Sequence, residues 1–206
     1  MENKTRIGIF SGTFDPPHLG HLAIAEAAAL QLHLDRVLWV VTPTPPHKQM
    51  RPITAVEHRV AMVSLAIAGE PKFELCTVDL DRPGPYYTVN TLEILQQKFQ
   101  DAELTFIMGS DLLPNFPCWV EINKVVSLCH EFGIAYRPGS QPDVASIEKA
   151  IPGIAEKLRI IAVPCIDVSS HEIRERCANG DACRGSLPQS VARYIDDHQL
   201  YAPDNG

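Results

Sequence analysis

Short apolar runs that alternate with stretches of helical spacing constrain the fold of this 206-residue chain more than any other feature. Each run is rich in β-branched or aromatic residues and is followed closely by Gly, Pro or Ser, as expected for a strand buried on both faces. The runs are Arg6–Phe10, Val37–Val41, Leu104–Met108, Phe132–Ala135 and Ile160–Val163. The stretches with helical spacing are Leu19–Leu32, Val56–Ala68, Val89–Phe99, Ser170–Asn179 and Val191–His198. The alternation predicts an α/β fold of the Rossmann-like, doubly wound kind, with a largely parallel sheet and helices on both faces.

Composition excludes several broad classes of protein. The chain has 18 Lys and Arg against 25 Asp and Glu, so its formal charge is −7, whereas general binding to nucleic acid needs a basic surface. No segment nears the roughly 18 apolar residues of a membrane span, and the N-terminus lacks a signal-peptide pattern. The six cysteines include no Cys-x-x-Cys pair, which favours reduced thiols in a cytoplasmic protein over disulfides. No repeat or shift in composition marks a boundary, so we expect residues 1–206 to form a single domain.

The segment IGIFSGTFDPPHLGH, from Ile7 to His21, has the pattern of a phosphate-binding turn. Its strand ends at Ser11, a tight turn follows at Gly12, and a helix opens near His18. Free backbone N–H groups and the positive end of the helix dipole then face any bound phosphate. His18 and His21 are three residues apart and therefore share one face of that helix.

The same segment lacks the marks of two familiar nucleotide-binding loops and of a zinc site. The fingerprints Gly-x-x-x-x-Gly-Lys-Ser/Thr and Gly-x-Gly-x-x-Gly are both absent, which argues against P-loop hydrolysis and hydride transfer. A zinc site lacks a third ligand, because the His-Glu pair at 171–172 is followed by Glu175 where His-Glu-x-x-His needs a histidine. Two histidines with a purely structural role remain an alternative.

A second candidate anion site lies in the segment from Asp167 to Arg174. Ser169 as N-cap and Glu172 three residues later predict a capping box. Ser170 and Arg174 then stand four residues apart on one face of the helix. A hydroxyl, a guanidinium and a helix N-terminus together suit a phosphate. The alternative is an ordinary capped surface helix with Arg174 in solvent.

These two segments resemble a known superfamily. His-x-Gly-His after Gly-Thr-Phe-Asp-Pro is similar to the signature of the nucleotidyltransferases related to class I aminoacyl-tRNA synthetases. The second segment resembles their Ile-Ser-Ser-Thr-x-Ile-Arg motif, with Val168 for Ile and His171 for Thr. The resemblance implies that His18, His21 and Arg174 act in catalysis at the triphosphate of the nucleotide donor. The other ATP-phosphate contacts expected here are Ser11, Gly12, Thr13 and Ser170.

Further stretches narrow the resemblance. They are Pro-Pro-His-Lys at 45–48, Asp-Arg-Pro-Gly-Pro-Tyr-Tyr-Thr from residue 81, Gly-Ser-Asp at 109–111 and Phe-Pro-Cys-Trp at 116–119. In this order they resemble the bacterial nicotinate-nucleotide adenylyltransferase family, which joins nicotinate mononucleotide to the AMP of ATP. The resemblance runs from about Ile7 to Tyr201, which is nearly the whole chain.

The resemblance also implies roles for residues outside the two anion sites. The backbone of Tyr87 and Thr88 would hold the pyridine carboxylate, and Trp119 would stack on the pyridine ring. Trp119 could instead be a core anchor. The ATP side would be completed by Lys48 near the phosphates, Gly109 and Asp111 at the ribose, and Arg137 near the adenine.

The implied reaction is an in-line attack of the mononucleotide phosphate on the α-phosphorus of ATP. Mg²⁺ would be held mainly by substrate phosphates and water, with no metal site belonging to the protein itself. ATP and nicotinate mononucleotide are the expected partners, and a homo-oligomer is possible. Three alternatives remain: a nicotinamide-preferring enzyme, a phosphopantetheine adenylyltransferase, and a non-catalytic nucleotide sensor.

Overall fold

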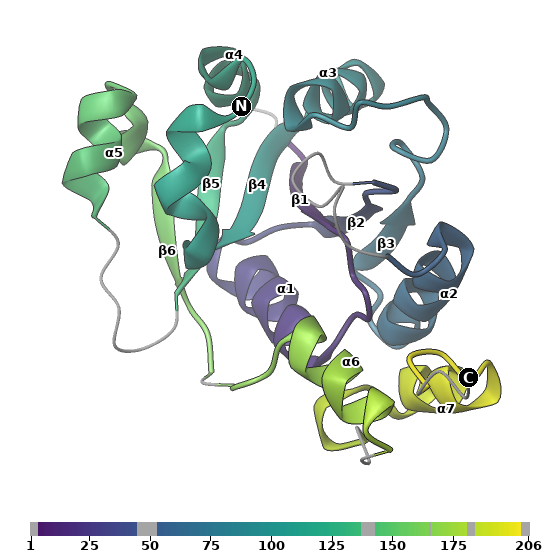
Figure 1. Ribbon diagram of the computed structural model, residues 1–206. Helices are drawn as coiled ribbons and strands as arrows, with labels where there is room; N and C mark the ends of the chain where they lie inside the picture. Colours follow the sequence, from purple (N-terminus) through teal and green to yellow (C-terminus); the bar gives the residue numbers. More distant parts are fainter. Residues whose placement is uncertain (1–3, 45–52, 137–142, 165, 181–183, 203–206) are drawn as a thin grey trace.

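A single twisted sheet organises the molecule (Figure 1). The computed structural model describes residues 4–44, 53–136, 143–164, 166–180 and 184–202. The sheet has six strands in the order β3-β2-β1-β4-β5-β6, and every strand pairs in parallel with its neighbours. The strands are β1 Arg6–Gly12, β2 Arg36–Val41, β3 Phe73–Cys76, β4 Glu103–Gly109, β5 Glu131–Tyr136 and β6 Leu158–Ala162.

Helices occupy the connections between the strands. The α-helices are α1 Leu19–Gln31, α2 Val56–Ile67, α3 Thr88–Lys98, α4 Ile122–Leu128, α5 Val144–Ala150, α6 Ser170–Ala178 and α7 Gln189–Asp197. Shorter 3₁₀ segments are η1 Ser110–Cys118, η2 Ile154–Glu156 and η3 Arg184–Ser186. No helix among the described residues is long and apolar enough to cross a membrane.

Each face of the sheet buries its own apolar cluster, because alternate residues of a strand point to opposite faces. In β1, Ile7 and Ile9 belong to the cluster covered by α3, α4 and α5, whereas Phe10 belongs to the cluster covered by α1 and α2. Leu38 and Trp39 of β2 divide between the two clusters in the same way. Helices therefore cover both faces, which confirms the predicted doubly wound α/β fold.

The five strands and five helices expected from the sequence are all present, with bounds shifted by a few residues at most. The elements β3, α4, α5, η1, η2 and η3 were not predicted from the sequence. β3 is a four-residue edge strand in which the exposed Glu74 interrupts the apolar pattern. Segment η1 contains Pro114 and Pro117, which cannot donate backbone hydrogen bonds and therefore obscure a helical pattern.

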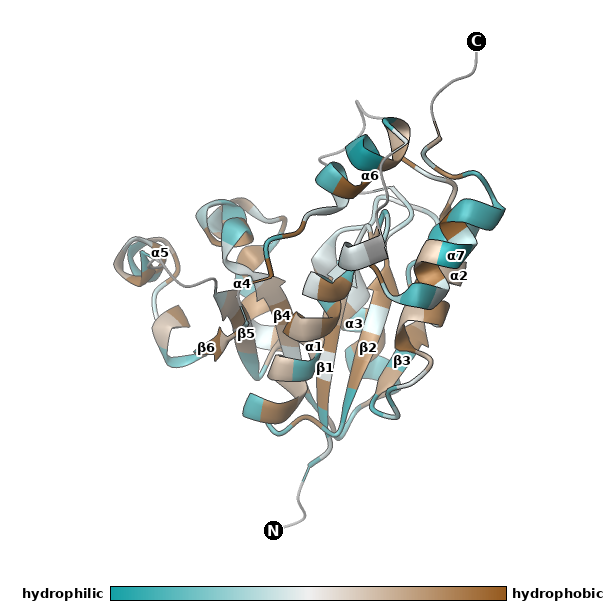
Figure 2. Ribbon diagram, turned by 90° about the horizontal axis from the view of Figure 1, so that it is seen from below, coloured by the Kyte–Doolittle hydropathy of each residue, from teal (hydrophilic) through white to brown (hydrophobic). Residues whose placement is uncertain are grey.

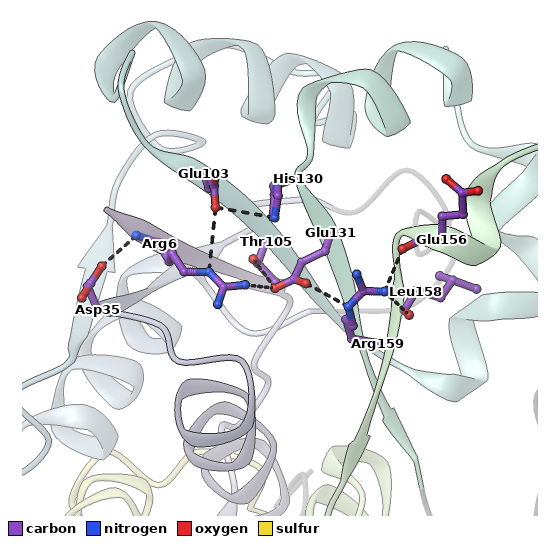
Figure 3. Close-up of polar contacts among 9 residues, drawn as sticks. All are labelled: Arg6, Asp35, Glu103, Thr105, His130, Glu131, Glu156, Leu158 and Arg159. Atoms are coloured by element: carbon purple, nitrogen blue, oxygen red, sulfur yellow. Dashed lines mark hydrogen bonds and ion pairs between the residues drawn. The ribbon is translucent and has the colours of Figure 1, made fainter. Parts of the chain in front are cut away.

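A buried carboxylate joins four strands near their amino ends (Figure 3). Glu131 is 3% exposed, and its Oε1 accepts hydrogen bonds from Arg6 Nη2 at 2.5 Å and from Thr105 Oγ1 at 3.4 Å. Arg159 Nε lies 3.2 Å from the other carboxylate oxygen. This network ties together β1, β4, β5 and β6 at the end of the sheet away from the loops described next.

The carboxyl ends of the strands are the natural place for a ligand. From β1 the sheet continues to β2 on one side and to β4 on the other. Connections from neighbouring strands diverge at such a switch point and leave a crevice in the sheet edge. The turn after β1 and the segment after β4 both start at this point, and they contain the first candidate phosphate turn and the Gly-Ser-Asp stretch.

Candidate active site

The turn between β1 and α1 has an unusual local structure. Phe14 adopts a left-handed backbone conformation with φ of 48°, and its ring packs edge-on against Phe10 in the core. Asp15 is buried and joined to Pro16 by a cis peptide bond. The turn ends at His18, which is the N-cap of α1.

The two histidines of this turn hold each other in place. His18 Nδ1 accepts from the backbone N–H of His21 at 3.3 Å, and His21 Nδ1 accepts from the backbone N–H of His18 at 3.2 Å. Their rings are stacked with centroids 3.7 Å apart. Since Nδ1 accepts in both rings, a neutral form of either carries its proton on Nε2. Each ring can therefore present an N–H donor at Nε2.

Gly20 gives the histidine pair its packing space. A Cβ added at this position would lie 3.0 Å from His18 Nδ1 and 3.1 Å from Val168 Cγ1. The absence of a side chain thus lets the His18 ring and the segment before α6 come close together. A glycine between two candidate phosphate-binding histidines could leave room for a ligand near the backbone, but here the space beside Gly20 is filled by protein.

Helix α6 lies near the start of α1 in both views of the ribbon (Figures 1 and 2). Ser170 Oγ donates to Pro16 O at 2.9 Å, and Arg174 Nη1 donates to Asp15 O at 2.6 Å across 159 residues of sequence. The alternative of a surface helix with Arg174 in solvent is therefore wrong. The two candidate anion sites form one continuous structure, as a shared polyphosphate site requires.

The start of α6 follows the motif only in part. Ser169 is the N-cap and its Oγ accepts from Glu172 N–H at 3.2 Å, which is the first bond of the predicted capping box. His171, which replaces the threonine of the motif, is exposed and lies 3.3 Å from Glu175 Oε1. This side chain thus pairs along the helix surface.

The residues expected at the pyridine ring gather on the face of the sheet covered by α3 and α4. Tyr87 is the N-cap of α3, Thr88 is its first residue, and Tyr87 packs against the same apolar cluster as Trp119. Trp119 is half-buried, with its ring edge-on to Phe106 at 5.6 Å and to Phe116 at 5.1 Å. Trp119 is therefore anchored in the core while part of its surface remains exposed.

The structure describes some of the other predicted ATP contacts but not all of them. Ser11 and Gly12 end β1, and Ser11 Oγ lies 3.2 Å from Thr42 Oγ1. Gly109 ends β4 beside the exposed Asp111, whose Oδ1 occupies the space that a Cβ at residue 109 would need. Lys48 and Arg137 lie outside the described residues.

Two residues that the sequence analysis did not single out also contact the turn. Arg59 of α2 is 1% exposed and donates through Nη1 to Thr13 O at 2.8 Å. Tyr201 donates its hydroxyl to Asp15 Oδ1 at 2.7 Å. Burial lowers the pKa of the Arg59 guanidinium, an effect opposed by the charge of Asp15, and burial also raises the pKa of the Tyr201 hydroxyl. The sequence does hold a signal for Arg59, because a charged residue stands there at a position of α2 that faces the core.

The described residues offer few metal ligands of their own. No group of three or more His, Cys, Asp or Glu side chains in this part of the chain could hold a metal ion.

Comparison with known proteins places the chain in a family. The cytidylyltransferase-like family model matches residues 9–176. A probable nicotinate-nucleotide adenylyltransferase of Thermomicrobium roseum is 44% identical over 96% of this chain and 92% of its own length. The chain belongs to the nicotinate-nucleotide adenylyltransferase family. Another relative of that name, from Bacillus licheniformis, is 38% identical over 95% of this chain and 98% of its own.

A solved structure shares the fold of this family member. Nicotinic acid mononucleotide adenylyltransferase of Plasmodium falciparum, complexed with NaAD, superposes with a TM-score of 0.79 at 22% identity. The match covers 96% of this chain and 97% of the other. Family membership confirms the resemblance found in the sequence and favours it over the phosphopantetheine adenylyltransferase alternative.

Proposed function

We infer that this chain is an enzyme that transfers the AMP part of ATP to nicotinate mononucleotide and releases pyrophosphate. The product is nicotinate adenine dinucleotide, so the reaction belongs to NAD biosynthesis. One structural observation carries the inference beyond family membership. The start of α6 is hydrogen-bonded to the β1–α1 turn through Ser170 and Arg174, so the two candidate anion-binding segments border one place.

The reaction needs alignment and charge stabilisation more than proton transfer. A phosphate oxygen of the mononucleotide attacks the α-phosphorus of ATP, a new P–O bond forms, and the bond to the β-phosphate oxygen breaks. The attacking phosphate has a second pKa of about 6 and is mostly deprotonated at neutral pH, so no side chain has to remove a proton. Negative charge moves to the departing pyrophosphate, and donors fixed in advance lower the barrier.

We assign these donors to the joined turn and helix. His18, His21 and Arg174 are the catalytic residues in this proposal, and the histidines donate through Nε2 because Nδ1 is used within the turn. The remaining phosphate contacts are Ser11, Gly12, Thr13, Lys48 and Ser170. Mg²⁺ bound to ATP would neutralise part of the phosphate charge.

The mononucleotide is assigned to the carboxyl end of the sheet near α3 and η1. The first turn of α3 has backbone N–H groups without partners inside the helix, and these suit the pyridine carboxylate bound at Tyr87 and Thr88. An amide in the same place would direct an NH₂ toward those donors. Trp119 offers an aromatic surface for the ring, and Gly109, Asp111 and Arg137 are left for the adenosine.

A direct assay tests this proposal. The purified chain is supplied with ATP, Mg²⁺ and either nicotinate mononucleotide or nicotinamide mononucleotide, and the dinucleotide and pyrophosphate are measured in parallel. We expect a higher kcat/KM with the acid. Preference for the amide would contradict the substrate assignment, and absence of both products would indicate a nucleotide-binding protein without catalysis.

A further inference from the structure

The buried Arg59 donates hydrogen bonds to backbone carbonyls of several separate segments around the β1–α1 turn. Arg59 Nη1 donates to Thr13 O at 2.8 Å and to Thr42 O at 2.9 Å. Its Nη2 donates to Pro43 O at 2.6 Å, and its Nε donates to Thr54 O at 2.9 Å. One side chain therefore joins the turn after β1, the end of β2 and the segment before α2.

Asp15 links the same turn to the end of the chain. Its Oδ1 accepts from the Tyr201 hydroxyl at 2.7 Å, and its Oδ2 accepts from Thr54 N–H at 3.3 Å. Thr54 thus donates to Asp15 through its N–H and accepts from Arg59 through its carbonyl. The two charged side chains, both almost completely buried, hold one stretch of backbone between them.

A small apolar cluster beside the sheet supports these residues. It packs together three helices through Met62 of α2, Ile173 of α6, and Val191 and Ile195 of α7. Arg59 lies in α2, Arg174 lies in α6, and Tyr201 follows the end of α7. All three side chains contact the backbone or side chain of residues 13–15.

The Arg59 contact fixes the direction of a donor in the turn. In a trans peptide the carbonyl of one residue and the N–H of the next point in opposite directions. The peptide that presents Thr13 O to Arg59 therefore points the N–H of Phe14 away from Arg59. A guanidinium fork can hold several carbonyls at once, whereas an ammonium is a single point charge.

We propose that Arg59 and Tyr201 are positioning residues, which orient residues 13–15 so that the turn binds the triphosphate of ATP. The kinetic test of this proposal rests on the proposed function, because it measures formation of the dinucleotide. The test by binding of an ATP analogue does not rest on it. Neither residue needs to touch a substrate. Their loss is expected to affect ATP and to leave the mononucleotide side, at Tyr87 and Trp119, largely unchanged.

The test compares Arg59→Met and Arg59→Lys with wild type. We expect kcat/KM for ATP to fall by roughly 10- to 100-fold in Arg59→Met, as displacements of about 1 Å in a site do, and by less in Arg59→Lys. KM for nicotinate mononucleotide at saturating ATP should change less than twofold in both variants. Affinity for a non-hydrolysable ATP analogue, measured by calorimetry, should fall in parallel with kcat/KM.

Glu131→Gln is the matched control. Glu131 is also a buried charge with several hydrogen bonds, but it lies at the amino ends of the strands, away from the candidate site. It should lower the melting temperature without changing either kinetic constant. If Arg59→Met behaves like this control, or weakens both substrates equally, Arg59 is only structural and the proposal is wrong.

Tyr201→Phe provides a second test if the Arg59 variants do not fold, since it removes one hydroxyl and keeps the ring. A severalfold loss of affinity for the ATP analogue, with KM for the mononucleotide unchanged, would support the proposal, and unchanged affinity would overturn it. Because this affinity is measured without turnover, an inactive wild-type chain would refute the proposed reaction without deciding the role of Arg59 and Tyr201.

Discussion

At the scale of single residues, each imidazole of the β1–α1 turn uses its two nitrogen atoms differently. Nδ1 of His18 and of His21 caps a backbone N–H of the other residue, which orients the ring and directs Nε2 away from the helix start. A substitution can remove the cap, the outer donor, or both. The choice of replacement therefore separates stability from catalysis.

We predict that His21→Ala lowers kcat by roughly 10²- to 10³-fold, with a smaller effect on ATP affinity, because a donor to the leaving group is lost. It should also lower the free energy of unfolding by about 1 kcal/mol through loss of the cap. His21→Asn keeps a short acceptor and should recover stability without recovering kcat. Steady-state kinetics and urea unfolding measure the two effects, and unchanged turnover in both variants would remove His21 from the mechanism.

Trp119 is predicted to affect the mononucleotide more than ATP. Trp119→Ala should raise KM for nicotinate mononucleotide by about tenfold or more, because aromatic stacking contributes roughly 1–3 kcal/mol. It should also reduce stability, by less than the roughly 3–5 kcal/mol of a fully buried aromatic residue, since the ring is half-buried. Trp119→Phe keeps an aromatic surface and should restore most of the binding. A change in stability alone would assign Trp119 to the core.

At the scale of elements, the start of α6 depends on its cap. Ser169→Ala removes the acceptor of Glu172 N–H and should reduce stability by about 1 kcal/mol. Fraying of this first turn displaces Ser170 and Arg174, so kcat/KM for ATP should fall severalfold.

The matched control for α6 is the cap of α5, where Asp143 Oδ1 accepts from Ser146 N–H at 3.0 Å. Asp143→Ala should cause a similar loss of stability and leave kcat/KM unchanged. Equal kinetic effects of the two substitutions would show that the α6 cap has no specific connection to the site.

At the scale of the whole molecule, a buried charge network and the candidate site lie at opposite ends of the strands. The Glu131 network joins the amino ends of the strands, whereas the candidate site lies at their carboxyl ends (Figures 2 and 3). We predict that Glu131→Gln lowers the free energy of unfolding by roughly 2–3 kcal/mol, because hydrogen bonds to a charged group are weakened. Chemical denaturation measures this loss, and a change of less than about 0.5 kcal/mol, the level of an ordinary surface substitution, would contradict it.

Local patterns were sufficient to predict most elements of this fold. Short apolar runs and helical periodicity depend on neighbours along the chain, so β1, β2, β4 and α1 could be predicted directly. The four-residue β3 escaped notice because an edge strand buries only part of its surface and tolerates polar residues.

By itself, the sequence determined the α/β class, the helix start at His18 and the candidate donors of the two anion-binding segments, since these depend on residues close together in the chain. The tertiary structure alone decided that Arg174 reaches Asp15, that Gly20 makes room for protein, and that Arg59 and Tyr201 hold the turn. The residues in these contacts, including Gly20 and Val168, are 46 to 186 positions apart in the sequence. Only the packing of the sheet and its helices brings them into contact.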